Sequence, residues 1–216
     1  MISYFYPQVP TLISVTQPLF SQLDKDADTV AELKINGTHL ILKRFEGDFV
    51  SDRRYEFWGR DGKKLKYNPS SKVLGALDRL EWEGDCELDG ELEHTKVHSR
   101  KHTIMLHDVI IWNGELLTDK TFAERRKILE SLFDGRVILM DVVEKRDYVK
   151  LKNLTVYPAI QWKKGYKEVY DEYIKFDEVE GLVIKKLSAL LKVGTRDCPI
   201  VTSMFKVRRP HKNYRF

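Results

Sequence analysis

Alternation of apolar and polar residues predicts a chain built mainly from β-strands. Residues 29–35 (TVAELKI) alternate, and a second β-rich run follows the dipeptide Asn36-Gly37, the strongest short signal for a hairpin turn. Turns are also predicted at Asp61-Gly62 and Asn113-Gly114. Further strands are predicted at 55–58, 86–93, 103–112, 136–144, 179–186 and 200–208. We therefore expect Lys34 to lie at a strand end, beside a tight hairpin turn.

Three segments place apolar residues at helical spacing. The first, 73–80, follows Ser70-Ser71, which can cap a helix. The second, 122–133, follows Thr121, and Glu124 completes a capping box with it. The third covers 159–175, where Gly165 weakens the pattern. Because strands outnumber helices and several are joined by hairpins, the sequence predicts an α+β fold with largely antiparallel sheets flanked by helices.

The composition indicates a single globular domain over residues 1–216. The chain is 42% hydrophobic and 32% charged, with no repeat, low-complexity segment or Pro/Gly/Ser-rich linker. No run approaches the ~20 apolar residues of a membrane span, and no basic leader precedes an apolar stretch, so we expect no membrane association and a cytoplasmic location. The two cysteines, Cys86 and Cys198, lack the spacing of a disulfide framework or a zinc site.

Positive charge is concentrated near the C-terminus. Residues 185–216 hold nine Lys/Arg against one acid, Asp197, which gives this basic segment a charge of +8 in a chain whose net charge is +4. Such a segment suits a polyanionic partner. A solvated, solubilising terminus has the same composition, and both interpretations stay open.

Lys34 is a candidate nucleophile. It lies between Leu33 and Ile35, and Gly37 would let a ligand approach the backbone. A lysine attacks phosphorus only as the free amine, a form that nearby cations favour. Converging strands could bring such cations from three positions, Lys185, Lys206 and Arg208. An ordinary solvated lysine is the alternative.

Glu91 and Glu180 are candidate ligands. Each adjoins a glycine within an apolar strand, in the segments ELDGEL and EVEGLVIK. Carboxylates there suit a divalent metal or a ribose hydroxyl better than they suit an apolar core. For either acid taken alone, an edge-strand residue that faces water is the favoured explanation.

Six short motifs follow one another along the chain: Lys34-Ile35-Asn36-Gly37, Trp58-Gly59-Arg60-Asp61-Gly62, Asp89-Gly90-Glu91, His107-Asp108-Val109, Glu180-Gly181-Leu182-Val183-Ile184-Lys185 and Lys206-Val207-Arg208. In this order they resemble the motifs of the covalent nucleotidyltransferase superfamily, which includes ATP-dependent DNA ligases, RNA ligases and messenger-RNA capping enzymes. Each motif alone is unspecific, but the ordered set is hard to obtain by chance. The ELDGEL, HDVIIWNGELL and FAERRKILESLF segments most resemble ATP-dependent DNA ligases, while Asn36 with Thr38 resembles some RNA ligases.

The resemblance implies a ligase-type adenylation domain that uses ATP with Mg²⁺ or Mn²⁺. Lys34 would attack the α-phosphate of ATP to give lysyl-AMP, and AMP would pass to the 5′-phosphate of a nicked or broken nucleic acid, DNA by preference, for displacement by a 3′-hydroxyl. The other implied roles are adenine recognition by Glu32, stacking by His107, ribose or 5′-phosphate binding by Arg60, ribose and metal binding by Glu91, metal binding by Glu180, and phosphate neutralisation by Lys185, Lys206 and Arg208. Arg60, Arg209, Lys212 and Arg215 would contact the nucleic acid, and a monomer is expected.

The chain departs from the family pattern at three points. His39 replaces an arginine five residues after the lysine, and His107 replaces a stacking aromatic. Only eight residues follow Arg208, whereas an OB-fold needs on the order of ~100, so no OB-fold is expected in this chain. Three alternatives stay open: an RNA ligase, a GTP-dependent capping guanylyltransferase, and an inactive relative that binds nucleic acid.

Overall fold

The computed structural model describes residues 9–13, 16–47, 54–94, 96, 101–133, 154–192 and 200–209. Within these ranges the chain forms two β-sheets and four α-helices, and most neighbouring strands are antiparallel. The predicted α+β class is confirmed. The strand predicted at 136–144 lies outside the described residues.

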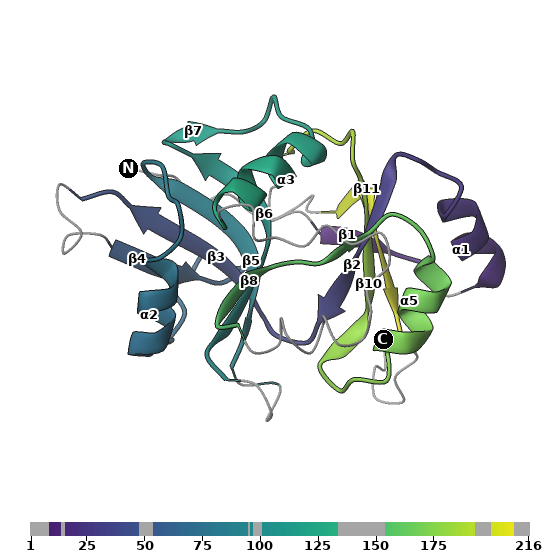
Figure 1. Cartoon of the computed structure of the whole chain (residues 1–216), viewed down its shortest axis with the longest axis horizontal. Coiled ribbons are helices and arrows are strands. Elements are labelled where there is room, and N and C mark those ends of the chain that lie inside the picture. The colour runs from purple at the N-terminus through teal and green to yellow at the C-terminus, as the bar shows by residue number, and fades with distance from the viewer. Residues whose placement is uncertain are drawn as a thin grey trace.

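The first sheet has five strands in the order β1-β11-β10-β2-β9. Their bounds are Val9–Leu12, Ile200–Arg208, Val179–Lys186, Thr29–Ile35 and Gln161–Trp162. Only the pair β1 and β11 is parallel. Helices α1 (Gln17–Leu23) and α5 (Tyr166–Tyr173) lie beside this sheet, at the right of Figure 1.

The second sheet has the order β4-β3-β5-β6-β7, and β8 pairs in parallel with β6. The bounds are Arg54–Trp58, Thr38–Phe45, Cys86–Glu93, Thr103–Trp112, Glu115–Leu116 and, for β8, Val156–Pro158. Helices α2 (Ser71–Leu77) and α3 (Phe122–Ser131) lie beside this second sheet (Figure 1). The predicted strands at 86–93, 103–112, 179–186 and 200–208 have the bounds observed here.

Both sequence-predicted helix caps are present. The Ser70 hydroxyl accepts a hydrogen bond from the Val73 amide at the start of α2. Thr121 and Glu124 form the capping box of α3, with the Glu124 carboxylate accepting from the Thr121 amide at 2.7 Å. These short-range interactions are encoded within four residues, which is why the sequence pattern identifies them.

The hairpin predicted at Asn36-Gly37 is wrong. Strands β2 and β3 on either side of it belong to different sheets, and neither residue has the positive φ of a tight hairpin turn. The Asn36 amide instead donates to the Glu178 carbonyl at 2.7 Å. Glycine is needed at 37 for space, because a Cβ there would lie 2.5 Å from Cγ of Glu91. The chain therefore passes from one sheet to the other directly after Lys34.

The helix predicted over 159–175 is too long. Gln161 and Trp162 form β9 by pairing with β2, and α5 begins only at Tyr166. Gly165 has φ of 71° at the N-cap, a left-handed conformation that does not continue a helix. The helical spacing of apolar residues is real from Tyr166 onward, but strand pairing overrides it before that point.

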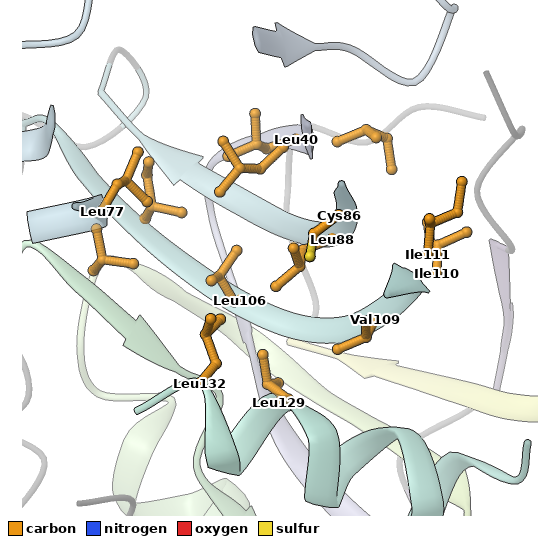
Figure 2. Close-up of a cluster of buried hydrophobic side chains, with 14 of the residues drawn as sticks. Leu40, Leu77, Cys86, Leu88, Leu106, Val109, Ile110, Ile111, Leu129 and Leu132 are labelled. Atoms are coloured by element: carbon orange, nitrogen blue, oxygen red, sulfur yellow. The ribbon is translucent and has the colours of Figure 1, made fainter. Parts of the chain in front are cut away.

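Each sheet has its own apolar cluster. Leu40, Leu88 and Leu106 of the second sheet lie in one cluster with Leu77 of α2 and Leu129 of α3 (Figure 2). Cys86 lies in this cluster, where burial raises the pKa of its thiol to about 11. The other cluster joins the first sheet to α1 and α5. None of the described helices has the length and apolar character needed to cross a membrane.

Candidate active site

Strand register brings the predicted site residues of the first sheet onto one face. Lys34 pairs with Gly181 on β10, which pairs with Arg208 on β11. Glu32 lies in the next row on the same face, opposite Val183, which pairs with Lys206. Directly opposed and alternate residues share a sheet face, so separate motifs of the sequence become neighbours.

A pocket opens over this face and is closed by residues of the second sheet. Eight of the nine predicted nucleotide-binding residues line it: Glu32, Lys34, Arg60, Glu91, His107, Lys185, Lys206 and Arg208. Other lining residues were not assigned a role from the sequence, among them His39, Asp89, Asp108, Leu191, Lys192 and Met204. Glu180, the ninth predicted residue, reaches the same site through its contacts with Lys34 and Arg208.

Lys34 is ion-paired with Glu180. Its Nζ lies 2.7 Å from Oε2 of Glu180, and the two side chains are 19% and 13% exposed. Arg208 approaches the same oxygen at 3.5 Å. Burial alone would raise the pKa of Glu180, but Lys34 and Arg208 outweigh it and the pKa is lowered. Glu180 is therefore a carboxylate that holds the lysine at the pocket.

Three cations, Arg60, Lys206 and Arg208, line the pocket with Lys34, and the sequence analysis named the last two of them for this place. The pKa of Lys206 is lowered by partial burial and by the charges of Arg208, Lys34 and Arg60. Crowded cations of this kind favour an anionic ligand such as a phosphate. Lys185 is different: it is buried and its Nζ lies 2.8 Å from Oε2 of Glu32.

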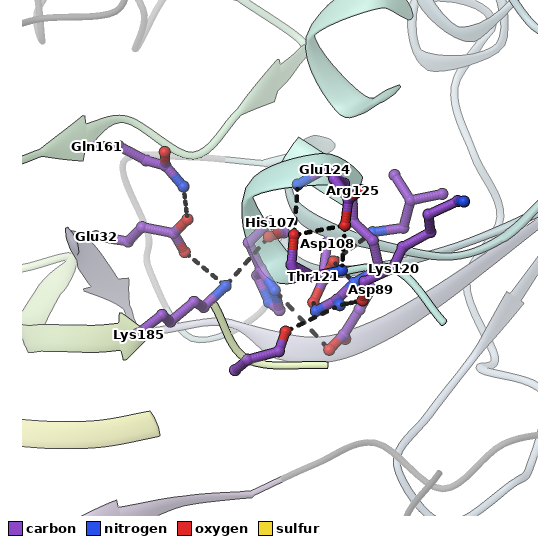
Figure 3. Close-up of polar contacts among 12 residues, drawn as sticks. Glu32, Asp89, His107, Asp108, Lys120, Thr121, Glu124, Arg125, Gln161 and Lys185 are labelled. Atoms are coloured by element: carbon purple, nitrogen blue, oxygen red, sulfur yellow. Dashed lines mark hydrogen bonds and ion pairs between the residues drawn. The ribbon is translucent and has the colours of Figure 1, made fainter. Parts of the chain in front are cut away.

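Glu32, a lining residue of the pocket, is held by two partners, Lys185 and Gln161 (Figure 3). Lys185 forms an ion pair with Oε2 of Glu32, and Nε2 of Gln161 donates a hydrogen bond to Oε1 at 2.7 Å. Burial opposes ionisation of Glu32, but Lys185, Arg126 and His107 together lower its pKa. The sequence analysis did not identify Gln161, because this residue lies in a segment whose apolar spacing predicts a helix.

Two histidines flank Asp89 inside the pocket. His39 Nε2 lies 3.0 Å from Oδ1, and His107 Nδ1 lies 3.8 Å from Oδ2. Although burial opposes ionisation of Asp89, His39 and His107 hold its pKa far below its usual range. Burial lowers the pKa of His107, which favours a neutral imidazole at the position of the expected stacking aromatic. The neighbouring Asp108 is turned to α3, where Arg125 donates to both its oxygens at 2.8 and 2.9 Å.

Glu91 and Glu180 are the two metal ligands that the sequence analysis named. Burial raises the pKa of Glu91 against the opposing charges of Lys34 and His39. The described part of the chain holds no group of three His, Cys, Asp or Glu side chains that could bind a metal. Two carboxylates nevertheless fit Mg²⁺, which is commonly bound through one or two carboxylates together with substrate phosphates.

Only part of the predicted nucleic-acid contact set is described. Arg60 lines the pocket, in the turn after β4. Arg209 follows β11, and its Nη2 donates to the Asp177 carbonyl at 3.3 Å. Lys212 and Arg215 lie outside the described residues.

A family model for the ATP dependent DNA ligase domain matches residues 91–206, more than half of the chain. The chain belongs to the ATP-dependent DNA ligase domain family. The matched part of this ligase domain contains Glu91, His107, Glu180, Lys185 and Lys206, whereas Lys34 precedes it. A comparison with curated proteins finds no match.

Solved DNA ligase structures share the fold of this ligase domain. A mycobacterial DNA ligase D complexed with ATP and MES matches with a TM-score of 0.62 at 17% identity, over 95% of this chain and 60% of that one. A Lig E DNA ligase described as binding DNA with a minimal scaffold gives 0.55 at 14% identity, over 94% and 68%. The ATP-dependent DNA ligase of bacteriophage T7 in complex with ATP gives 0.52 at 13%, over 92% and 67%. The ligase domain thus spans 60% of the length of the mycobacterial structure.

Proposed function

We propose that this domain joins DNA ends through a covalent Lys34–AMP intermediate. The observation that carries the proposal is the position of Lys34, whose ammonium lies in a pocket shared with Arg60, Lys206 and Arg208. Lys34 is ion-paired with Glu180, and the cations beside it would bind a phosphate that the lysine can attack.

In the first step Lys34 Nζ attacks the α-phosphorus of ATP. The N–P bond forms as the P–O bond to the β-phosphate breaks, and pyrophosphate leaves. Lys34 must first lose a proton, and the neighbouring cations favour its free amine form. Lys206, Arg208 and Arg60 would neutralise the phosphate charge, since positioning and charge neutralisation supply most of the catalysis in phosphoryl transfer.

In the second step an oxygen of a 5′-phosphate end attacks the same phosphorus, and the N–P bond to Lys34 breaks. The 3′-hydroxyl of the adjoining end then attacks the 5′-phosphate and releases AMP, which forms the phosphodiester. Glu91 and Glu180 would hold a divalent metal ion together with phosphate oxygens, and that ion would supply further positive charge.

The test is intact mass after mixing with ATP. The parent protein is expected to gain the mass of AMP, and Lys34→Ala is expected to gain none while keeping its Tm within a few degrees, because the lysine side chain is part of a surface pocket and not of either core. Lys186→Met, a lysine removed from β10 outside the pocket, is the control and should still form the adduct. Adduct on Lys34→Ala would contradict the assignment of the nucleophile.

The polynucleotide is tested separately with nicked duplexes in which each strand is DNA or RNA. We expect sealing of a nick with DNA on both sides. Exclusive sealing of RNA ends would replace the DNA proposal with the RNA ligase alternative, whereas a GMP adduct in place of AMP would indicate capping chemistry. If no nucleotide adduct forms, the remaining alternative is an inactive relative that only binds nucleic acid.

A further inference from the structure

Gln161 is a buried amide that contacts the pocket-lining residue Glu32. Its side chain is 6% exposed and lies on the short edge strand β9, directly opposite Glu32 on β2. Its Nε2 donates to Oε1 of Glu32 at 2.7 Å, and Gln161 is not itself a lining residue (Figure 3). Gln161 can therefore act on a ligand in the pocket through the Glu32 carboxylate.

The other oxygen of Glu32 is held from the opposite side. Lys185 Nζ lies 2.8 Å from Oε2 and also donates to the His107 carbonyl at 3.1 Å. The same ammonium lies 4.5 Å from the centre of the Phe122 ring. Because both oxygens have a donor and the carboxylate is only 2% exposed, its plane and direction are fixed.

A carboxylate held in this way still has acceptor capacity. Each oxygen carries two lone pairs, so one donor on each leaves about two lone-pair sites unused. Glu32 lines the pocket and lies on the same face of β2 as Lys34, two residues away, so the distance along the strand is about 7 Å. A nucleotide with its phosphates at Lys34 can thus bring its base to Glu32.

We propose that Gln161 is a positioning residue that sets the base preference of this pocket, in favour of a base with an exocyclic amino group. The inference rests on the proposed function, since it concerns the nucleotide that Lys34 attacks. An amino group donates to the oriented carboxylate, whereas a keto oxygen at the same place would bring its lone pairs against a buried negative charge. A site that is built to accept a hydrogen bond rejects a group that cannot donate one.

The alternative is that Gln161 only completes the pairing of β9 with β2. That role would affect stability and would leave the choice of base unchanged. The two roles are separated by a ratio, the rate of adduct formation with ATP divided by the rate with GTP, each at limiting nucleotide.

The experiment measures this ratio by intact mass for the parent, Gln161→Met and Gln161→Ala. Methionine keeps the length of the side chain and removes the donor. We expect the ATP:GTP ratio to fall about tenfold, which corresponds to about 1.4 kcal/mol, together with a higher KM for ATP. Trp162→Phe is the matched control: it alters the neighbouring residue on β9, packed in the core below, and should lower Tm while leaving the ratio unchanged.

A second measurement needs no folded variant. Purine riboside triphosphate lacks the amino group of ATP, and the parent should use it less well than ATP if Glu32 accepts from that group. Equal use of the two nucleotides, or an unchanged ATP:GTP ratio in a folded Gln161 variant, overturns the inference. Failure of the parent to form an adduct with any nucleotide overturns the proposed function instead, so the two failures are distinguishable.

Discussion

At the scale of single residues, the pocket gathers like charges at a cost in stability. Lys206 is the clearest case, because partial burial, Arg208, Lys34 and Arg60 together lower its pKa below the usual 10.5. The folded chain thus binds this proton less readily than the unfolded chain does. The resulting penalty is present in full below the folded-state pKa and disappears as the pH rises towards the unfolded value.

Lys206→Met should therefore raise Tm at pH 7 by up to a few degrees, with a gain that shrinks as the pH approaches 10.5. The same change should slow adduct formation, since one phosphate-binding cation is lost. Thermal unfolding over a pH series, alongside the mass assay, measures both effects. Lys186→Met removes the same charge outside the pocket and controls for net charge. A Lys206→Met protein that is less stable than the parent at pH 7 would argue that Lys206 is a structural cation.

At the scale of elements, the passage from β2 to β3 depends on Gly37. A Cβ at this position would lie 2.5 Å from Cγ of Glu91 and 2.8 Å from the Leu92 carbonyl oxygen, so the chain at the start of β3 would have to move away from β5. Gly37→Ala should cost about 1–3 kcal/mol through overpacking, and it should slow adduct formation because Lys34 and Glu91 are displaced relative to one another.

Gly75→Ala provides the contrast. Gly75 lies within α2, and the nearest atom to an added Cβ is a flexible arginine nitrogen at 3.7 Å. Alanine there should stabilise the chain by about 1 kcal/mol and leave the adduct rate unchanged. Denaturant unfolding and the mass assay decide both cases, and equal effects of the two substitutions would contradict the role given to Gly37.

At this scale the sequence predicts local features such as caps and strand bounds, but it does not predict which strands pair. The capping box at Thr121 and the strand 86–93 depend on neighbouring residues, and the pattern identifies them. The partner of a strand depends on the rest of the fold: Asn36-Gly37 carries a hairpin signal, yet β2 pairs with β9 and β10. Gln161 was missed for the same reason, because its contact with Glu32 follows from a two-residue strand that no periodicity reveals. The ordered motifs named residues that line one pocket, although the pairing of their strands could not be predicted from periodicity.

At the scale of the whole molecule, the structure changes how the basic segment 185–216 is interpreted. Its charge of +8 suggested one surface for a polyanion, but Lys185 is paired with Glu32, and Lys206 and Arg208 line the pocket. Fewer of its cations are thus available to contact a duplex backbone. The candidates that remain for that role include Arg209, Lys212 and Arg215, which we expect to contribute to DNA binding.

Binding that neutralises six phosphates gives a slope of about −5 in a plot of log affinity against log salt concentration, and each lost contact reduces the slope by about 0.9. Changing Arg209, Lys212 and Arg215 together to Ser should therefore roughly halve the slope for nick binding by the adenylated protein. The control variant changes three exposed lysines outside the pocket to Ser, namely Lys25, Lys163 and Lys164, and so removes the same charge. Its slope should stay near that of the parent. Equal slopes for both triple variants would mean that the terminal cations act only through net charge, and that the duplex is held by other residues.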